Sequence, residues 1–328
     1  MNIFLSVIIP IYNTSAYLQR CVTSLLDQTI DDGIEFVFID DASNDDSLVI
    51  LKRIIALYPH RQSQISIICH EENMGIAFSR REGIILAKGQ YIGWCDSDDW
   101  CDPDMFRQLL SIMQADDSDI SVCNYLVHEG DSVRTETKNY HSNPREHIRL
   151  LYLQPDSNMF LWHVLFRRSL FLENRIYPYE GLNIGEDLNL SIRAFCKASK
   201  LSFTPNILYH HNNNNSQSLV KNNRKDTRAR LNNDCRNTDL ICSFLEQEGA
   251  DEFYLTCQFL RFQTKWGFDA LFGYTRPYFD LYSCTHHDLR HFNGIPSLLR
   301  CKMMLLFHSY ISFFFFSSIY RMKQKIFG

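Results

Sequence analysis

The chain has 328 residues, enough for one large domain or two smaller ones. Its hydrophobic content of 45% is typical of a globular protein with a full core, and its formal net charge of -5 excludes the basic surface that nucleic acids require. The 11 cysteines are odd in number and include no C-x-x-C pair, which disfavours a disulfide framework or a zinc ribbon and favours a reducing, cytoplasmic compartment.

Strand and helix patterns alternate over the first hundred residues. We expect strands at 5–11, 36–39, 65–69 and 91–95, and helices at 16–28, 47–58 and 79–88. Thr14 or Ser15 is suited to cap the first of these helices, and Gly89 is suited to end the last. The order β-α-β-α-β-α-β predicts a parallel sheet with helices on both faces.

Polar residues follow each of the four predicted strands. Right-handed crossovers place the carboxyl ends of parallel strands along one edge of the sheet, where open α/β sheets bind their ligands. The residues at these ends are Tyr12-Asn13, Asp40-Asp41, Asn73-Gly75 and Asp96-Asp98. The chain has neither G-x-G-x-x-G after the first strand nor G-x-x-x-x-G-K-[ST], which disfavours a dinucleotide site and a P-loop.

The segment GQYIGWCDSDDWCDPD, residues 89–104, is the most informative of these strand ends. Asp96, Asp98 and Asp99 repel one another unless a cation neutralises them. Mg²⁺ or Mn²⁺ is the natural candidate, because both prefer oxygen ligands. The alternative is an acidic loop that caps the next helix, with Asp99 or Asp102 as the N-cap.

Less specific patterns continue beyond residue 104. They predict a helix at 105–114, strands at 120–127 and 201–211, and helical segments from 238 to 272. Residues 212–215 are four asparagines, for which we expect a polar loop.

Two features near the C-terminal end leave alternatives open. Residues 303–320 are apolar and aromatic with basic flanks. The alternatives are peripheral contact with an anionic membrane through residues 300–325, a core helix, or a true membrane span. His286, His287 and His291, after Cys284, have a metal-like spacing but lack a clear fourth ligand.

Four segments in the same order resemble the successive motifs of glycosyltransferase family 2, the sugar transferases of the GT-A fold. They are SVIIPIYN, FIDDASNDDS, ENMGIAFSRREGIILAKGQYIGWCDSDDWCDPD and GEDLNL. The resemblance implies an α/β fold, a Rossmann-like and mostly parallel sheet flanked by helices, with a C-terminal helical extension. It divides the chain into a nucleotide-sugar-binding half at 1–105, an acceptor-binding half at 106–216 and a helical extension at 217–328 that contacts a membrane in one alternative.

The resemblance also implies roles for individual residues. The nucleotide site would comprise Pro10, Tyr12, Asn13, Asp41, Arg80 and Asp96. In the family the tyrosine lies against the base, the aspartate of the second motif hydrogen-bonds the base, and the first aspartate of D-x-D lies near the ribose. Asp98, with Asp96, would hold Mn²⁺ or Mg²⁺ on the diphosphate. The family commonly has Asn at the position of Arg81 and Leu at that of Cys95, and the pair Arg80-Arg81 leaves open which arginine faces the diphosphate.

The acceptor side and the catalytic base follow from the same resemblance. The G-E-D motif places the base at Asp187 and an acceptor contact at Glu186, and both residues are also suited to a helix N-terminus after Gly185. Trp162 is predicted to form an acceptor wall or to pack in the core. His210 or His211 is either a third metal ligand or a solvated histidine.

The predicted function is an inverting transfer of a sugar from a nucleotide-diphosphate sugar, with UDP as the expected nucleotide, to an acceptor hydroxyl. Partners would be that donor and a glycan or lipid-linked acceptor of polysaccharide or glycolipid synthesis, with no nucleic acid, at the inner face of the cell membrane. One alternative is a nucleotidyltransferase, but residues 10–15 lack the Gly-rich basic loop expected for it. The other is a catalytically inactive nucleotide-sugar-binding module, which retention of the motif aspartates disfavours.

Overall fold

A computed structural model describes residues 3–137, 140–153, 159–216, 218, 227–266 and 280–288. These residues fall into two compact units. The first comprises the described residues up to 147 together with 159–216 and 218, and the second comprises 148–153, 227–266 and 280–288. The predicted boundaries at 105 and 216 stay predictions.

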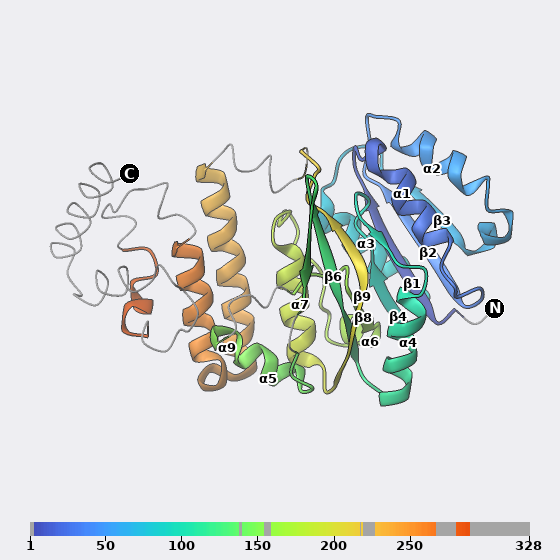
Figure 1. Cartoon of the computed structure of the whole chain (residues 1–328). Helices are drawn as coiled ribbons and strands as arrows, with labels where there is room; N and C mark the ends of the chain where they lie inside the picture. Colours follow the sequence, from blue (N-terminus) through green and yellow to red (C-terminus); the bar gives the residue numbers. More distant parts are fainter. Residues whose placement is uncertain are drawn as a thin grey trace. The chain divides into compact units, whose positions relative to one another are not determined.

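The first unit is built on one mixed sheet (Figure 1). Its strands are β1 Leu5–Ile11, β2 Ile34–Asp40, β3 Ile65–Cys69, β4 Tyr91–Trp94, β5 Trp100–Cys101, β6 Ile120–Glu129, β7 Ser132–Glu136, β8 Val164–Arg167 and β9 Leu201–Asn212. Their order is β3-β2-β1-β4-β8-β6-β9-β5, with β7 paired to β6. β3, β2, β1 and β4 are parallel, as the alternating pattern predicted, whereas β8 runs antiparallel to both of its neighbours.

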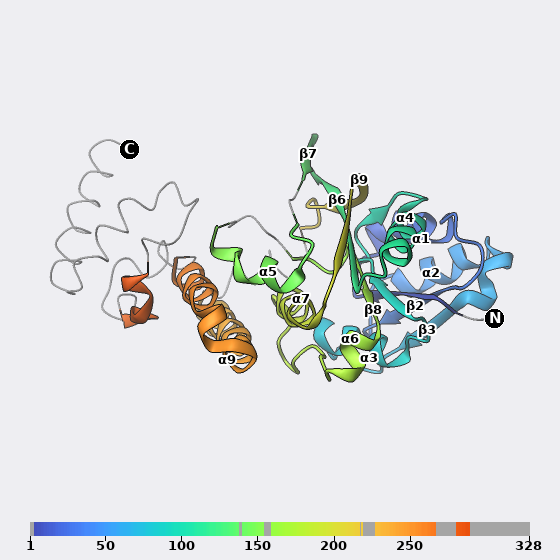
Figure 2. The ribbon, with the colours of Figure 1, turned by 90° about the horizontal axis from the view of Figure 1, so that it is seen from below.

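Helices cover both faces of this sheet. Their bounds are α1 Ser15–Leu26, α2 Ser47–Ile55, α3 Ile76–Leu86, α4 Met105–Asp116, α5 Pro144–Arg149, α6 Ser169–Glu173 and α7 Glu186–Lys197, with a 3-10 helix η1 at Pro59–Gln64. Figure 2 shows α1, α2 and α4 on one side of the strands and α3 and α6 on the other. This confirms the predicted α/β architecture with two helical layers.

Burial on both faces explains the uninterrupted apolar runs of the central strands. β1 and β2 are buried at every position. Successive side chains of a strand point to opposite faces, so Val7 and Ile9 join the core with α1 while Ile8 faces α3. There α3 lies so close that a Cβ on Gly83 would be 2.4 Å from Cγ2 of Ile8.

Two local predictions were wrong. Gly89 does not end α3, because that helix stops at Leu86 and Ala87 is already extended. Gly89 is required instead for close packing, since a Cβ there would lie 2.6 Å from the main-chain nitrogen of Ser6. The caps expected at Asp99 or Asp102 are also wrong, because the N-cap of α4 is Asp104.

The second unit contains α9 Thr227–Trp266 and two 3-10 helices, η2 Leu151–Leu153 and η3 Ser283–His287. Gly249 has non-helical dihedrals inside α9, so two helical segments meet there. Within the described residues, no helix is both long and apolar enough to cross a membrane. The segment 300–325, His291 and the side chains of His286 and His287 lie outside what the structure describes.

Candidate active site

The end of β2 and the N-x-G turn meet at Asp41. Its side chain is buried, and its carboxylate accepts the main-chain N–H groups of Met74 and Gly75, both at 2.8 Å. His70, the residue after β3, places Nδ1 2.6 Å from Oδ1 of the same carboxylate. Asp41 therefore connects the ends of β2 and β3, two strand ends that the sequence predicted to lie at one edge.

The turn after β1 lies beside this group. Asn13 adopts a left-handed φ of 51°, and its side chain accepts the N–H of Asn44, while Tyr12 is 41% exposed. Pro10 is buried within β1 and pairs with Ile39. The main-chain nitrogen of Pro10 is on the side of β1 that faces β4, but the pairing with β4 ends at Ile8. The N–H that proline lacks therefore costs no hydrogen bond of the sheet.

Arg80 joins two motifs that are far apart in the sequence. Its Nη2 lies 2.7 Å from Oδ1 of Asp96, and its Nη1 forms an ion pair with Oε1 of Glu186. The arginine and glutamate side chains are only 3% and 5% exposed. Burial disfavours the guanidinium charge, but the two carboxylates raise the pKa of Arg80 above its ordinary value. Arg80, rather than the exposed Arg81, is therefore the arginine that faces the acidic loop.

The G-E-D motif begins α7. Gly185 is the N-cap with a left-handed φ of 71°, and Glu186 and Asp187 form the first turn, where acidic side chains favour the helix dipole. Burial, opposed by Arg80 and reinforced by Asp187, raises the pKa of Glu186 to about 8. Burial also raises the pKa of Asp187, and its Oδ1 accepts the N–H of Leu188 at 2.7 Å. Both carboxyl groups consequently accept a proton more readily than an ordinary surface acid.

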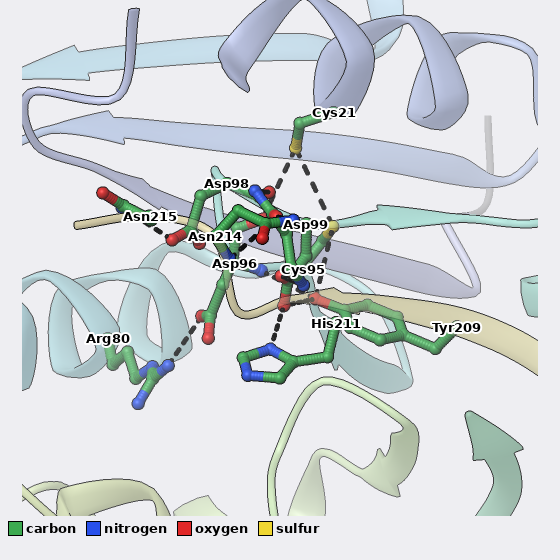
Figure 3. A network of polar contacts seen from close by, with 11 residues as sticks. Cys21, Arg80, Cys95, Asp96, Asp98, Asp99, Tyr209, His211, Asn214 and Asn215 are labelled. Carbon is green, nitrogen blue, oxygen red and sulfur yellow. Dashed lines mark hydrogen bonds and ion pairs between the residues drawn. The ribbon is translucent and has the colours of Figure 1, made fainter. Parts of the chain in front are cut away.

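The acidic loop after β4 is held by β9 and by the asparagines at the end of that strand (Figure 3). Asp99 is buried and accepts the hydroxyl of Tyr209 at 2.8 Å and the main-chain N–H of Asn212 at 2.7 Å. Asn215 donates its side-chain amide to Oδ2 of Asp98 at 2.8 Å. Asp99 is thus a structural acid in this loop, while Asp98 is the more accessible one.

Crowding of negative charge makes Asp98 suited to a divalent cation. Burial and the charges of Asp99 and Asp96 raise the pKa of Asp98 to about 7. Among the described contacts, Oδ1 of Asp98 accepts no hydrogen bond. No three acidic, cysteine or histidine side chains of the described residues converge as metal ligands. Mg²⁺ is commonly bound by one or two carboxylates together with substrate phosphates. Asp98 and Asp96 therefore fit such an ion.

The two adjacent histidines of β9 have different surroundings. His211 Nδ1 lies 3.2 Å from Oδ2 of Asp99; burial disfavours the charged ring, but the bond to Asp99 and the nearby carboxylates raise the pKa of His211 to about 9. His210 instead contacts Asp102 at 3.0 Å and stacks on Trp100. Alternation along a strand therefore directs one histidine to the acidic loop and the other away from it.

Trp162 lies behind His211 in an aromatic stack. The indole ring is parallel to His211 at 5.4 Å and to Tyr209 at 4.5 Å between ring centroids, and the side chain is 3% exposed. Of the two predicted placements, the structure has Trp162 packed in the core, where it supports His211. Its contact with an acceptor stays a prediction.

Sequence reasoning missed two contributors to this edge. The run 212–215 was expected to be only a polar loop, yet the side-chain amides of Asn212 and Asn215 donate to Asp98, and the main-chain N–H of Asn212 donates to Asp99. His70 was not singled out at all. Its place directly after a strand and before N-x-G was the available signal, because every other strand end at this edge carries a polar residue.

The fold places an acidic loop at the carboxyl ends of the parallel strands, where open α/β sheets bind their ligands, and comparison with known proteins identifies the family. The model of glycosyl transferase family 2 matches residues 6–174, more than half of the chain, and the chain belongs to this family. Among solved structures, residues 1–349 of S. aureus TarS in complex with UDP-GlcNAc are similar with a TM-score of 0.71 and 18% identity over 98% of this chain and 92% of that one. At this identity the likeness establishes the GT-A fold.

Two curated relatives show how much of each chain is similar. The putative glycosyltransferase EpsH of Bacillus subtilis is 33% identical over 211 residues, 62% of this chain and 59% of EpsH. A poly(ribitol-phosphate) beta-glucosyltransferase of Bacillus spizizenii is 28% identical over 211 residues, 63% of this chain and 32% of that protein. The matched region is therefore less than two thirds of either relative.

Proposed function

We propose that the chain is an inverting glycosyltransferase that moves a sugar from a nucleotide-diphosphate sugar, UDP being the expected nucleotide, to an acceptor hydroxyl. The observation that carries this proposal is the position of Arg80, which forms ion pairs with Asp96 of the D-x-D motif and Glu186 of the G-E-D motif. A donor bound at the D-x-D motif would then lie beside the G-E-D motif, whose Asp187 would activate the acceptor.

The nucleotide would bind at the ends of β1, β2 and β4. Tyr12 is exposed enough to lie against a base, and Asn13 shapes the turn that presents it. The Asp41 carboxylate has acceptor capacity for a base N–H, and Asp96, one quarter exposed, lies next to Arg80 where a ribose would reach. Pro10 contributes through the backbone of β1 rather than by direct contact, since its side chain is buried.

Asp98, with Asp96, would hold Mn²⁺ or Mg²⁺ beside the donor diphosphate. Such an ion supplies Lewis-acid stabilisation of the negative charge that develops on the leaving diphosphate. The chain's own part is to keep Asp98 in place through Asn215 and to keep Asp99 bonded to the main chain of β9.

Asp187 would be the general base that takes the proton of the acceptor hydroxyl. Direct displacement with inversion needs one such carboxylate opposite the leaving group and no second carboxylate nucleophile. Its raised pKa brings it closer to neutrality, which suits a base that must accept a proton in the transition state. Glu186, paired with Arg80, would orient this turn and contact the acceptor. Trp162, which stacks on His211, would contribute to the acceptor wall.

For the acceptor we propose a cell-surface glycan or a lipid-linked precursor of one. Support comes from one of the relatives, a poly(ribitol-phosphate) beta-glucosyltransferase. A cytoplasmic site at the inner membrane face remains part of this proposal. The segment 300–325, on which membrane contact depends, lies outside the described residues. Membrane fractionation of the full chain against a chain truncated near residue 295 would test that contact, and an unchanged distribution would contradict it.

The test of the proposed function combines binding with turnover. Calorimetry with UDP and several UDP-sugars, with Mn²⁺ or Mg²⁺, would be run on the wild type, on Asp98→Ala and on Asp104→Asn as a control. Asp104 belongs to the same acidic segment, but it occupies the N-cap position of α4 and its side chain forms an ion pair with Arg107. We expect metal-dependent binding that is lost in Asp98→Ala and kept in Asp104→Asn.

Turnover distinguishes an enzyme from an inactive binding module. Asp187→Asn is expected to bind UDP-sugar as the wild type does while UDP release falls about 100-fold or more, in line with the contribution of a general base. UDP binding that is unchanged without metal and unchanged in Asp98→Ala would contradict the assignment of Asp98 as a metal ligand. Full turnover in Asp187→Asn would contradict the assignment of Asp187 as the general base.

A further inference from the structure

His70 is buried between two carboxylates at the nucleotide edge of the sheet. It follows β3 directly, and its side chain is 7% exposed. Nδ1 lies 2.6 Å from Oδ1 of Asp41, and Nε2 lies 2.9 Å from Oε2 of Glu82 on α3. Ionised carboxylates only accept hydrogen bonds, so both ring nitrogens must donate. The ring that satisfies both contacts is therefore an imidazolium.

The surroundings of His70 favour this charged state. Asp41 faces the ring from the end of β2, Glu82 faces it from α3, and Phe78 of α3 packs edge-on with 5.4 Å between ring centroids. Burial disfavours the charged ring, but the hydrogen bonds to both carboxylates raise the pKa of His70 above its ordinary value. The histidine thus keeps its proton further into the neutral range than a free histidine does.

Asp41 is the group through which His70 would act. Its oxygens also accept the N–H groups of Met74 and Gly75, so the described donors comprise two neutral main-chain groups and one charged ring. Gly75 has a left-handed φ of 88° and is the N-cap of α3, the helix that carries Arg80. The orientation of the Asp41 carboxylate and the start of α3 are therefore set together.

We propose that His70 is a positioning residue of the nucleotide site, where its imidazolium holds the Asp41 carboxylate in the orientation that accepts the N–H of a uracil-type base. The inference rests on the proposed function, in which Asp41 binds the base. Without the proton on His70, Asp41 is held by neutral donors and its charge is no longer balanced. The affinity for uridine nucleotides then falls as the pH rises through the pKa of His70 in the folded protein.

Two amide substitutions separate the two ring nitrogens. In His70→Asn the side-chain amide approximates Nδ1, so a neutral donor to Asp41 remains. In His70→Gln the amide approximates Nε2, so the contact with Glu82 remains and the contact with Asp41 is lost. A third variant, Glu82→Gln, keeps an acceptor oxygen but removes one of the two charges that hold the proton on His70.

The measurement is calorimetric titration of each variant with UDP between about pH 6 and about pH 8.5. For the wild type we expect affinity to fall about fivefold over this range, the difference between a charged and a neutral hydrogen bond. His70→Asn should bind as the wild type does at the higher pH and show no such fall. His70→Gln should be weaker than His70→Asn at both ends, and Glu82→Gln should move the fall to lower pH.

The results distinguish this inference from the proposed function beneath it. Absence of UDP binding to the wild type would overturn both. UDP binding that needs Asp98 and metal, with the same pH dependence in the wild type and both His70 variants, would overturn the role of His70 alone. If His70→Gln does not fold, an unmoved pH midpoint in Glu82→Gln contradicts the inference equally, since that variant leaves the histidine in place.

Discussion

Replacing Arg80 by Gln tests the ion pairs that join the two motifs. The substitution removes the charge that faces Glu186, whose side chain is 5% exposed, and Asp96, whose side chain is 26% exposed. Removing one partner of a buried ion pair costs about 3–5 kcal/mol, because the other charge is left uncompensated. Most of this cost falls on Glu186, since water partly screens the Asp96 carboxylate. We expect Arg80→Gln to lower the free energy of unfolding by about 3 kcal/mol or more.

A double-mutant cycle separates this effect from lost packing. The free energy of unfolding would be measured in urea without nucleotide at about pH 9, above the pKa of about 8 of Glu186, for Arg80→Gln, Glu186→Gln and the double variant. The double variant leaves no uncompensated charge on residue 186. Its free energy of unfolding should therefore fall by about 2 kcal/mol less than the sum of the decreases in the two single variants. Arg81→Gln, an exposed neighbour on α3, is the control and should change stability by less than about 0.5 kcal/mol. Single losses that simply add would refute the ion pair as a stabilising link.

Two further predictions concern stability alone. Burial lowers the pKa of His147 to about 4. Below about pH 6.5 the unfolded state therefore binds a proton at this histidine that the folded state does not bind. Stability is therefore lost as the pH falls between these values. The loss between pH 7 and pH 4.5 should be about 2–3 kcal/mol smaller in His147→Phe, and an equal loss in both proteins would contradict the assignment. Gly89→Ala should cost about 2 kcal/mol or more, because its Cβ would meet the backbone of Ser6. Gly130→Ala has open space around it and only a left-handed φ of 57°, so thermal denaturation should show a cost of about 1 kcal/mol; equal costs at both glycines would contradict the packing argument.

Short-range patterns were sufficient for the first half of the sheet. The predicted strands at 5–11 and 65–69 have the observed bounds of β1 and β3, and the parallel direction of the first four strands follows from alternating strands and helices. By contrast, the two-residue strand β5 and the hairpin strand β7 were not expected. Both have side chains without a strand pattern, and they become strands only because β9 and β6 lie beside them.

The sequence by itself determined which residue types gather at the carboxyl ends of the parallel strands, because strand ends and turn residues are local features. The strand pattern and the turn residues alone place Asp41, Asp96 and Asp98 at that edge. The tertiary structure decided what holds them: Arg80 pairs with Glu186 across 106 positions, and Asn215 reaches Asp98 across 117. Contacts at such separations depend on how α3, α7 and β9 pack on the sheet, and no local pattern encodes that packing. The same physical reason explains why His210 and His211, adjacent in the chain, face different surroundings.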